Sequence, residues 1–159
     1  MSGSNIQPVQ MMDLDGDGRE EALAFFRQSD GEKPLKIHIF TTDDDNSYRQ
    51  AAVIEGSGLA IYSVDYSDID GDGRMEIIVG WRVSMDLQAL VVYSLKPDGA
   101  RELMRTNYVK YAVADLNKDG KRELTVLRAN QDGEGVADCY VSKNGALTLR
   151  SSVLVSMTM

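Results

Sequence analysis

The sequence predicts an all-β protein made of three similar units, each a sheet of four antiparallel strands. An acidic, glycine-containing loop occurs three times in the 159 residues, as DLDGDG from Asp13, DIDGDG from Asp68 and DLNKDG from Asp115. Short apolar runs of strand character flank each copy, and no run of about ten residues keeps a helical period between two caps. Four-stranded units that recur about every 50 residues are typical of propeller blades. We therefore expect three blades of a partial β-propeller.

Each unit is expected to begin with a strand that enters the loop and to continue with a strand that leaves it. Two more strands complete the unit, joined by turn-forming residues such as Asp-Gly and Asn-Gly, which favour hairpins. The entering strands are predicted at 7–12, 60–67 and 108–114, and the leaving strands at 20–26, 75–81 and 122–128. The remaining strands are predicted at 35–40, 48–54, 88–95, 101–105, 136–142 and 147–155. The single repeat domain, residues 1–159, thus divides into blades at about 6–56, 57–106 and 107–159.

Charge and composition exclude several classes of partner. The net charge of −8 argues against nucleic acid and against an anionic membrane surface. No apolar run approaches the roughly 20 residues that span a membrane, so no transmembrane segment is predicted. The single cysteine excludes a disulfide framework. Residues 1–5, MSGSN, are interpreted as an added leader, in which case a native targeting segment would have been removed.

The three loops share the pattern Asp-x-Asp/Asn-x-Asp-Gly-x-x-Glu, which offers oxygen ligands to a hard cation. Side chains at positions 1, 3 and 5 converge when the backbone coils, and glycine at position 6 permits the sharp turn. The carbonyl oxygen at position 7 and the carboxylate at position 9 complete the set. The candidate calcium ligands are Asp13, Asp15, Asp17, Arg19 and Glu21, then Asp68, Asp70, Asp72, Arg74 and Glu76, then Asp115, Asn117, Asp119, Lys121 and Glu123.

The loop pattern has two alternative interpretations. An EF-hand needs a glutamate at position 12, where this chain has Ala24, Val79 and Val126, so that reading fails. Turns held by aspartate hydrogen bonds without metal are the second alternative. Two carboxylates about 4 Å apart repel by about 4 kcal/mol at an effective dielectric near 20, which favours a cation in the first two loops. The third loop carries Lys118, Lys121 and Arg122 against its acids, so calcium is less expected there.

The stretches DLDGDGREE, DIDGDGRME and DLNKDGKRE, each followed by an apolar strand, resemble the FG-GAP/VCBS-type repeats of integrin-like β-propellers. The resemblance implies a calcium-stabilised propeller, usually of six to eight blades, on a secreted or surface-anchored protein. A bacterial lipoprotein, anchored through a removed N-terminus, is the form we expect. Position 9 departs from the integrin pattern, which has aspartate there. The longer glutamate must either be accommodated at the metal or hydrogen-bond the loop amides.

The sequence predicts no catalytic residue. His38 is the only histidine, and in KIHIF it alternates with Ile37 and Ile39. The aromatic residues around the loop-bearing strands are expected to pack between blades; they are Tyr62, Tyr66, Trp81, Tyr108 and Tyr111. The first functional hypothesis is therefore an extracytoplasmic repeat module that binds a protein or glycan. The alternatives are part of a polysaccharide-acting, lyase-like enzyme, for which related propellers give precedent, and a structural spacer.

Three blades cannot close a propeller, and they leave one uncovered sheet face at each end of the array. Repeat proteins require their end faces to be covered. The sequence therefore predicts either a piece of a longer propeller or self-association, for example two copies that close a ring of three and three blades.

Overall fold

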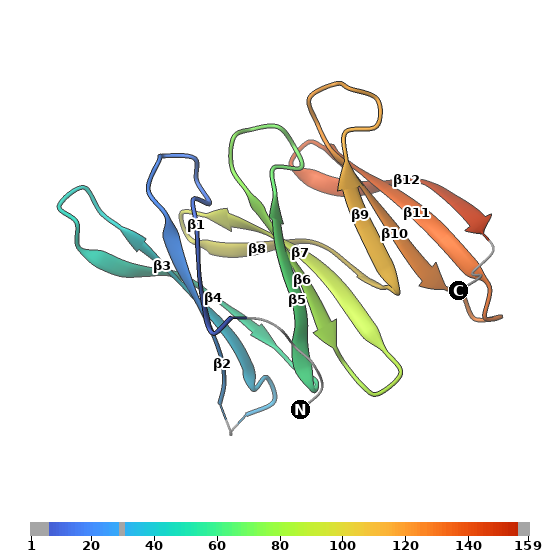
Figure 1. The fold of residues 1–159 in the computed structure, drawn as a ribbon, viewed down its shortest axis with the longest axis horizontal. Coiled ribbons are helices and arrows are strands. Elements are labelled where there is room, and N and C mark those ends of the chain that lie inside the picture. Colours follow the sequence, from blue (N-terminus) through green and yellow to red (C-terminus); the bar gives the residue numbers. More distant parts are fainter. Residues whose placement is uncertain (1–6, 29–30, 156–159) are drawn as a thin grey trace.

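A computed structural model describes residues 7–28 and 31–155, so the predicted leader at residues 1–5 lies outside the described residues. Within them the chain forms three four-stranded antiparallel sheets, which confirms the predicted all-β fold. The sheets lie side by side as an open, partial propeller, and the three acidic loops project from the same edge of the array (Figure 1). No described segment forms a helix long and apolar enough to cross a membrane.

The strands follow one another in space as they do in sequence, because each is joined to the next by a short turn or loop. Blade 1 contains β1 (Val9–Met12), β2 (Glu21–Arg27), β3 (Leu35–Thr42) and β4 (Tyr48–Gly56). Blade 2 contains β5 (Ala60–Ser67), β6 (Glu76–Arg82), β7 (Gln88–Lys96) and β8 (Gly99–Asn107). Blade 3 contains β9 (Lys110–Ala114), β10 (Glu123–Ala129), β11 (Gly135–Lys143) and β12 (Ala146–Val155).

The three blades share one pairing register. In each blade the pairing of the third and fourth strands shifts by a residue at the same step, at Ile39/Phe40, Val92/Tyr93 and Cys139/Tyr140. Residues at corresponding places can therefore be compared directly between blades. We call the face of a blade toward the preceding blade its leading face, and the face toward the following blade its trailing face.

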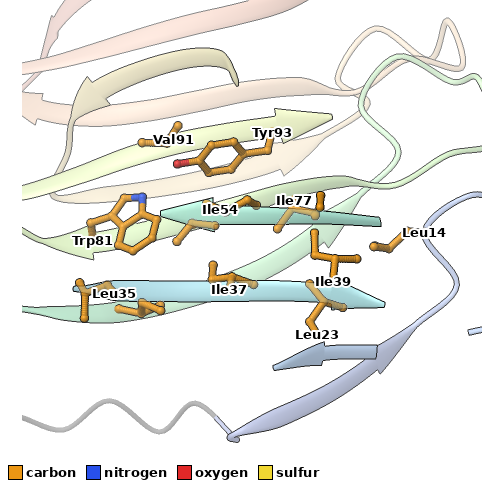
Figure 2. Packing of buried hydrophobic residues seen from close by; sticks show 13 residues of the cluster. Leu14, Leu23, Leu35, Ile37, Ile39, Ile54, Ile77, Trp81, Val91 and Tyr93 are labelled. Carbon is orange, nitrogen blue, oxygen red and sulfur yellow. The ribbon is translucent and has the colours of Figure 1, made fainter. Parts of the chain in front are cut away.

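Two hydrophobic clusters hold the blades together, one in each gap between neighbouring sheets. The first joins the trailing face of blade 1, including Ile37 and Ile39, to the leading face of blade 2, including Ile77 and Trp81 (Figure 2). The second joins blade 2 to blade 3 through residues such as Ile78 and Leu124. Blade 2 is covered on both faces, so β6 is buried from Glu76 to Trp81 instead of alternating. Burial of the two clusters supplies most of the driving force for stacking.

Aromatic residues close the gaps between blades, as the sequence predicted for most of them. Trp81 is buried against the end of β4, where a β-carbon on Gly56 would lie 2.4 Å from the indole ring. The Tyr66 hydroxyl donates to Gln10 Oε1 of blade 1 at 2.8 Å, and the Tyr111 hydroxyl donates to Asp65 of blade 2. Tyr62 differs, since its ring is exposed and lies under the Arg82 guanidinium.

Candidate metal-binding loops

The first aspartate of each loop closes it by accepting backbone hydrogen bonds. In the first loop the two carboxylate oxygens of Asp13 accept the N–H groups of Gly16 and Gly18, each at 2.9 Å. Asp68 accepts those of Gly71 at 2.9 Å and Gly73 at 2.8 Å in the second loop. Asp115 accepts Asp119 N–H at 3.1 Å and Gly120 N–H at 3.0 Å in the third. The short Asp side chain is suited to such turns because it reaches backbone groups a few residues ahead.

The aspartate at position 5 of each loop also accepts a hydrogen bond from the backbone two residues ahead. Asp17 Oδ1 accepts Arg19 N–H at 2.8 Å, and the corresponding bonds run from Arg74 to Asp72 at 2.8 Å and from Lys121 to Asp119 at 2.9 Å. The position 7 residues therefore meet the loop through their N–H groups. That their carbonyl oxygens bind metal stays a prediction.

One group of carboxylates converges in each loop, with oxygen atoms that all lie within 4.8 Å of one another. The groups differ in membership between the loops. They are Asp13, Asp15 and Asp17, then Asp68, Asp70 and Glu76, then Asp115, Asp119 and Glu123. Oxygen-only donors at this spacing fit a hard cation such as calcium, which takes six to eight oxygen ligands.

The glutamate at position 9 has a distinct role that the sequence left open. Its side chain is buried and reaches back into the loop, where Glu21 Oε1 accepts Leu14 N–H at 2.7 Å and Glu76 Oε1 accepts Ile69 N–H at 2.8 Å. In the third loop Glu123 Oε2 accepts Leu116 N–H at 3.3 Å. The second oxygen of Glu21 accepts from the Thr41 hydroxyl at 3.4 Å. The extra methylene of glutamate thus lets the carboxylate reach the backbone N–H at position 2 and accept its hydrogen bond.

Burial and the proximity of other carboxylates shift the pKa values of several carboxyl groups in the first two loops. Burial raises the pKa of Asp15 and of Glu21, and burial also raises the pKa of Asp70. Burial, with a smaller contribution from Asp70 and Asp72, raises the pKa of Glu76 to about 7. The hydrogen bond from Arg19 N–H lowers the pKa of Asp17 instead. Carboxylates with raised pKa values are stabilised by a nearby cation, because a cation favours their charged form.

The basic residues of the third loop do not neutralise it by direct pairing. Arg122 Nη1 donates to Ser67 Oγ of blade 2 at 2.7 Å, so its guanidinium contacts the neighbouring blade. Across the part of the chain that the structure describes, no ion pair joins Lys118 or Lys121 to a carboxylate of this loop. In the first loop, by contrast, Arg19 pairs with Asp17 at 3.4 Å. The positive charge of the third loop therefore acts at longer range than the sequence suggested.

His38 lies in an aromatic row and not in a polar cleft. Its ring centroid is 4.7 Å from that of Phe26 and 6.3 Å from that of Phe40. Its Nδ1 is 2.7 Å from Gln50 Oε1. The side chain of His38 is therefore flanked by Phe26, Phe40 and Gln50.

The repeat signature of these loops is also found by comparison with known families. Residues 13–79 match the model of the FG-GAP-like repeat. The matched segment begins at the first aspartate of the first loop and runs through the second loop into β6, so it spans two of the three copies. This match supports the repeat family that the loop pattern resembles. No curated protein matches the chain.

Among solved structures the fold resembles a rhamnogalacturonan lyase of Bacillus licheniformis, with a TM-score of 0.53 and 17% sequence identity. The alignment covers 93% of this chain and 34% of that chain, so this chain spans about a third of the lyase's length. At this identity the likeness shows the fold alone.

Proposed function

We propose that this protein is a calcium-stabilised, extracytoplasmic β-propeller module that binds a protein or glycan partner. One observation carries the proposal: three neighbouring blades each present a group of carboxylate oxygens within 4.8 Å at the same edge. Building such groups three times, with a buried glutamate beside the first and within the other two, concentrates negative charge where a cation would offset it.

In this proposal the ligands are the side-chain oxygens at positions 1, 3 and 5, which are carboxylates except for the amide of Asn117, together with the carbonyl oxygen at position 7. The position 9 glutamate joins them in the second and third loops. Bound calcium would neutralise the loop and favour the charged form of its acids. The chain's own contribution is a loop shaped in advance by the hydrogen bonds of Asp13, Asp68 and Asp115. A preformed loop loses less conformational entropy when it binds an ion.

An extracytoplasmic location on a bacterial surface, with a lipid anchor on a removed N-terminus, belongs to the same proposal. The FG-GAP-like match over residues 13–79 supports the extracytoplasmic part of this proposal, and we expect the calcium affinity of the loops to be low. Extracellular calcium modules bind with a Kd of about 10⁻⁴–10⁻³ M. Partner binding follows from the fold type, since stacked repeats present extended surfaces.

A polysaccharide-acting enzyme is the second candidate, favoured by the fold of the Bacillus licheniformis lyase. An activity assay on rhamnogalacturonan with and without calcium, measuring chain length, separates the two. We expect no shortening of the polymer, because a lyase needs a basic residue that takes up a proton, or a second metal cluster, in a cleft, and among the described residues the converging acidic groups all lie in the three repeated loops. Calcium-dependent shortening would favour the enzyme.

Calcium is expected to raise the melting temperature of this protein, and EDTA to lower it. A ligand that binds only the folded state stabilises by about 2.7 kcal/mol per site at one hundred times Kd. For a chain of this size that corresponds to about 5–10 °C per site. Differential scanning calorimetry in calcium and in EDTA measures the shift. The exposed variant Asp86→Asn, outside the loops, should keep it, and identical melting curves in the two buffers would favour turns without metal.

The three loops are expected to differ in their affinity for calcium. Asp15→Ala or Asp70→Ala should weaken calcium binding by at least about tenfold, a change of about 1.4 kcal/mol. Asn117→Ala should weaken it less, because the third loop has one carboxylate fewer and three basic residues in its sequence. Titration calorimetry of the three variants, each checked for β structure by circular dichroism, measures this order. Equal losses at all three loops would show that loop charge does not set affinity.

A further inference from the structure

A cavity of about 150 Å³ lies between blades 1 and 2, at the edge of the array that carries the acidic loops (Figure 1). We call it the basic cavity, because its lining includes Arg49, Arg74 and Lys96. These residues come from β4, from the second loop and from the end of β7, so the packing of two blades brings them together. In a chain with a net charge of −8, three basic side chains around one cavity form a local site of attraction for an anion.

The basic side chains of this cavity are only partly paired within the molecule. Arg49 pairs with Asp43 through its Nε, at 2.8 Å. Among the described residues, no ion pair includes Arg74 or Lys96. A guanidinium presents its donors in a planar fork that fits a carboxylate, and a lysine ammonium adds a compact positive charge. The charges of the basic cavity therefore fit a carboxylate group.

The gap between blades 2 and 3 contains a counterpart of this cavity that is nearly filled. The register shift in the pairing of the third and fourth strands leaves Ala51 without a partner in blade 1 and Leu103 without one in blade 2. Leu103 lines the counterpart, whose wall includes Asp70 where the basic cavity has Asp15. The counterpart measures about 20 Å³, which is room for about one water molecule. An alanine in place of a leucine leaves more space, in keeping with the larger volume of the basic cavity.

The counterpart also has fewer basic residues in its wall. Arg101 takes the place of Arg49 in the strand pairing and does not line the counterpart. Lys121 takes the place of Arg74 at loop position 7 and does not line it either. Only Lys96 belongs to both walls. Blades 2 and 3 thus pack without the space and the three basic residues, so the packing of blades does not require them.

The surroundings of the basic cavity favour an isolated carboxylate over a polyanion. The first two loops, which both contribute to its wall, carry four carboxylates each, at positions 1, 3, 5 and 9. One calcium ion in each loop would offset only half of that charge. A polymer with a negative charge on every unit would bring further charges against these loops. A single carboxylate between neutral or basic groups would not.

The rest of the lining suits a side chain carried by a polypeptide. Ala51, Leu95 and Pro97 offer apolar contacts to the methylene groups of a glutamate. Asp15 offers an acceptor to a neighbouring ammonium group or backbone N–H. The two guanidinium groups keep their protons in neutral water, so they bind an anion and supply no base.

We propose that the basic cavity binds a glutamate side chain of a protein partner, in a segment where lysines flank that glutamate. The carboxylate pairs with Arg49, Arg74 and Lys96, and the flanking lysines pair with the acidic loops. The proposal rests on the partner binding proposed above and deepens it, because it names the class of partner and the place where it docks.

Titration of the full chain with the peptide Ac-Lys-Glu-Lys-NH2 in EDTA, followed by NMR shifts of the backbone amides, measures this binding. The peptide Ac-Lys-Gln-Lys-NH2 has the same shape without the carboxylate. We expect a Kd on the order of 1 mM for the glutamate peptide and at least about tenfold weaker binding of the glutamine peptide. Equal binding of the two would show that only the lysines are recognised and would overturn the proposal. Absence of binding by both would overturn it as well.

Matched variants locate the binding in the basic cavity. Arg74→Gln should weaken binding of the glutamate peptide at least about tenfold, while Arg101→Gln, which removes the same charge outside the cavity, should leave the Kd unchanged. Ala51→Leu gives blade 1 the residue that blade 2 has at this place, and it should also weaken binding at least about tenfold by filling the space. Equal losses in the two arginine variants would show that net charge sets the affinity and would overturn the proposal. If Ala51→Leu does not fold, Lys96→Gln replaces it, and an unchanged Kd there would be equally contrary.

Two further measurements separate this proposal from the other parts of the proposed function. D-Glucuronate carries its carboxylate on a sugar and should bind more weakly than the glutamate peptide. Binding as tight as that of the peptide, and sensitive to Arg74→Gln, would overturn the proposal in favour of a glycan. A rise of the melting temperature in calcium without peptide binding would reject the proposal and leave the calcium-stabilised module standing. Peptide binding without any effect of calcium on the melting temperature would support the proposal and reject the role of calcium.

Discussion

Replacing Gly16 with alanine is expected to destabilise the protein by about 2–5 kcal/mol, while replacing Gly18 costs only about 1–2 kcal/mol. Both glycines belong to the first loop and have similar backbone angles, with φ of 76° and 87°. An alanine at either position therefore carries the cost of a left-handed conformation. Only the Gly16 β-carbon meets the neighbouring blade, 2.5 Å from the Gly73 carbonyl oxygen, whereas the Gly18 β-carbon meets nothing within 4 Å.

Urea denaturation in EDTA measures this difference without a contribution from metal. The second loop offers an independent copy of the pair, since a β-carbon on Gly71 meets the Gly120 carbonyl oxygen and one on Gly73 meets nothing within 4 Å. We therefore expect Gly71→Ala to lower the free energy of unfolding more than Gly73→Ala does. If the two alanine variants of each loop lose the same free energy of unfolding, the contacts of Gly16 with Gly73 and of Gly71 with Gly120 do not constrain the loops.

The free energy of unfolding of the metal-free protein is expected to rise by up to about 3 kcal/mol through Glu76 as the pH falls from about 7.5 to about 4.5. Burial, with the smaller effect of Asp70 and Asp72, raises the pKa of Glu76 from 4.5 to about 7 in the folded state. Between these values the folded protein binds a proton that the unfolded chain releases. The stabilisation from protonated Glu76 is therefore fully present below the unfolded pKa and is lost as the pH rises through about 7.

Glu76→Gln isolates this contribution, because a glutamine Oε1 can still accept the Ile69 N–H without carrying a charge. We expect the variant to gain stability at neutral pH and to lose most of the pH slope between about 5 and 7.5. The matched control is Glu20→Gln, a change at an exposed glutamate beside the first loop. Urea denaturation in EDTA across this pH range measures both. A slope that is the same in wild type and Glu76→Gln would mean that Glu76 is charged throughout.

The repeat and the strands could be predicted from sequence because their signals are local. The alternation of apolar residues, the Asp-Gly and Asn-Gly turns and the recurring aspartates lie within a few residues of the structures they produce. The convergence of the loop carboxylates is local in the same sense, since Asp13, Asp15 and Asp17 are adjacent along the chain. The apolar run IIVGW matches the burial of β6 on both faces. The run alone does not predict that burial, because it depends on a blade lying on each side of β6.

The sequence by itself determined an all-β array of three blades with an acidic loop in each, because strand period and turn chemistry act over short distances. Only the tertiary structure decided which contacts the loop side chains make and how neighbouring loops pack against each other. The sequence left open whether the Glu76 side chain serves the metal group or an amide, and the structure does both: one carboxylate oxygen accepts Ile69 N–H, and the carboxylate also belongs to the converging group of the second loop. Arg122 could have paired with a carboxylate of its own loop, but its guanidinium donates a hydrogen bond to the Ser67 hydroxyl of blade 2 instead. The requirement for glycine at Gly16 and Gly71 arises only because a loop some 50 residues further along the chain packs against each of them. Contacts between distant residues depend on how whole sheets pack, and no local pattern in the chain specifies that packing.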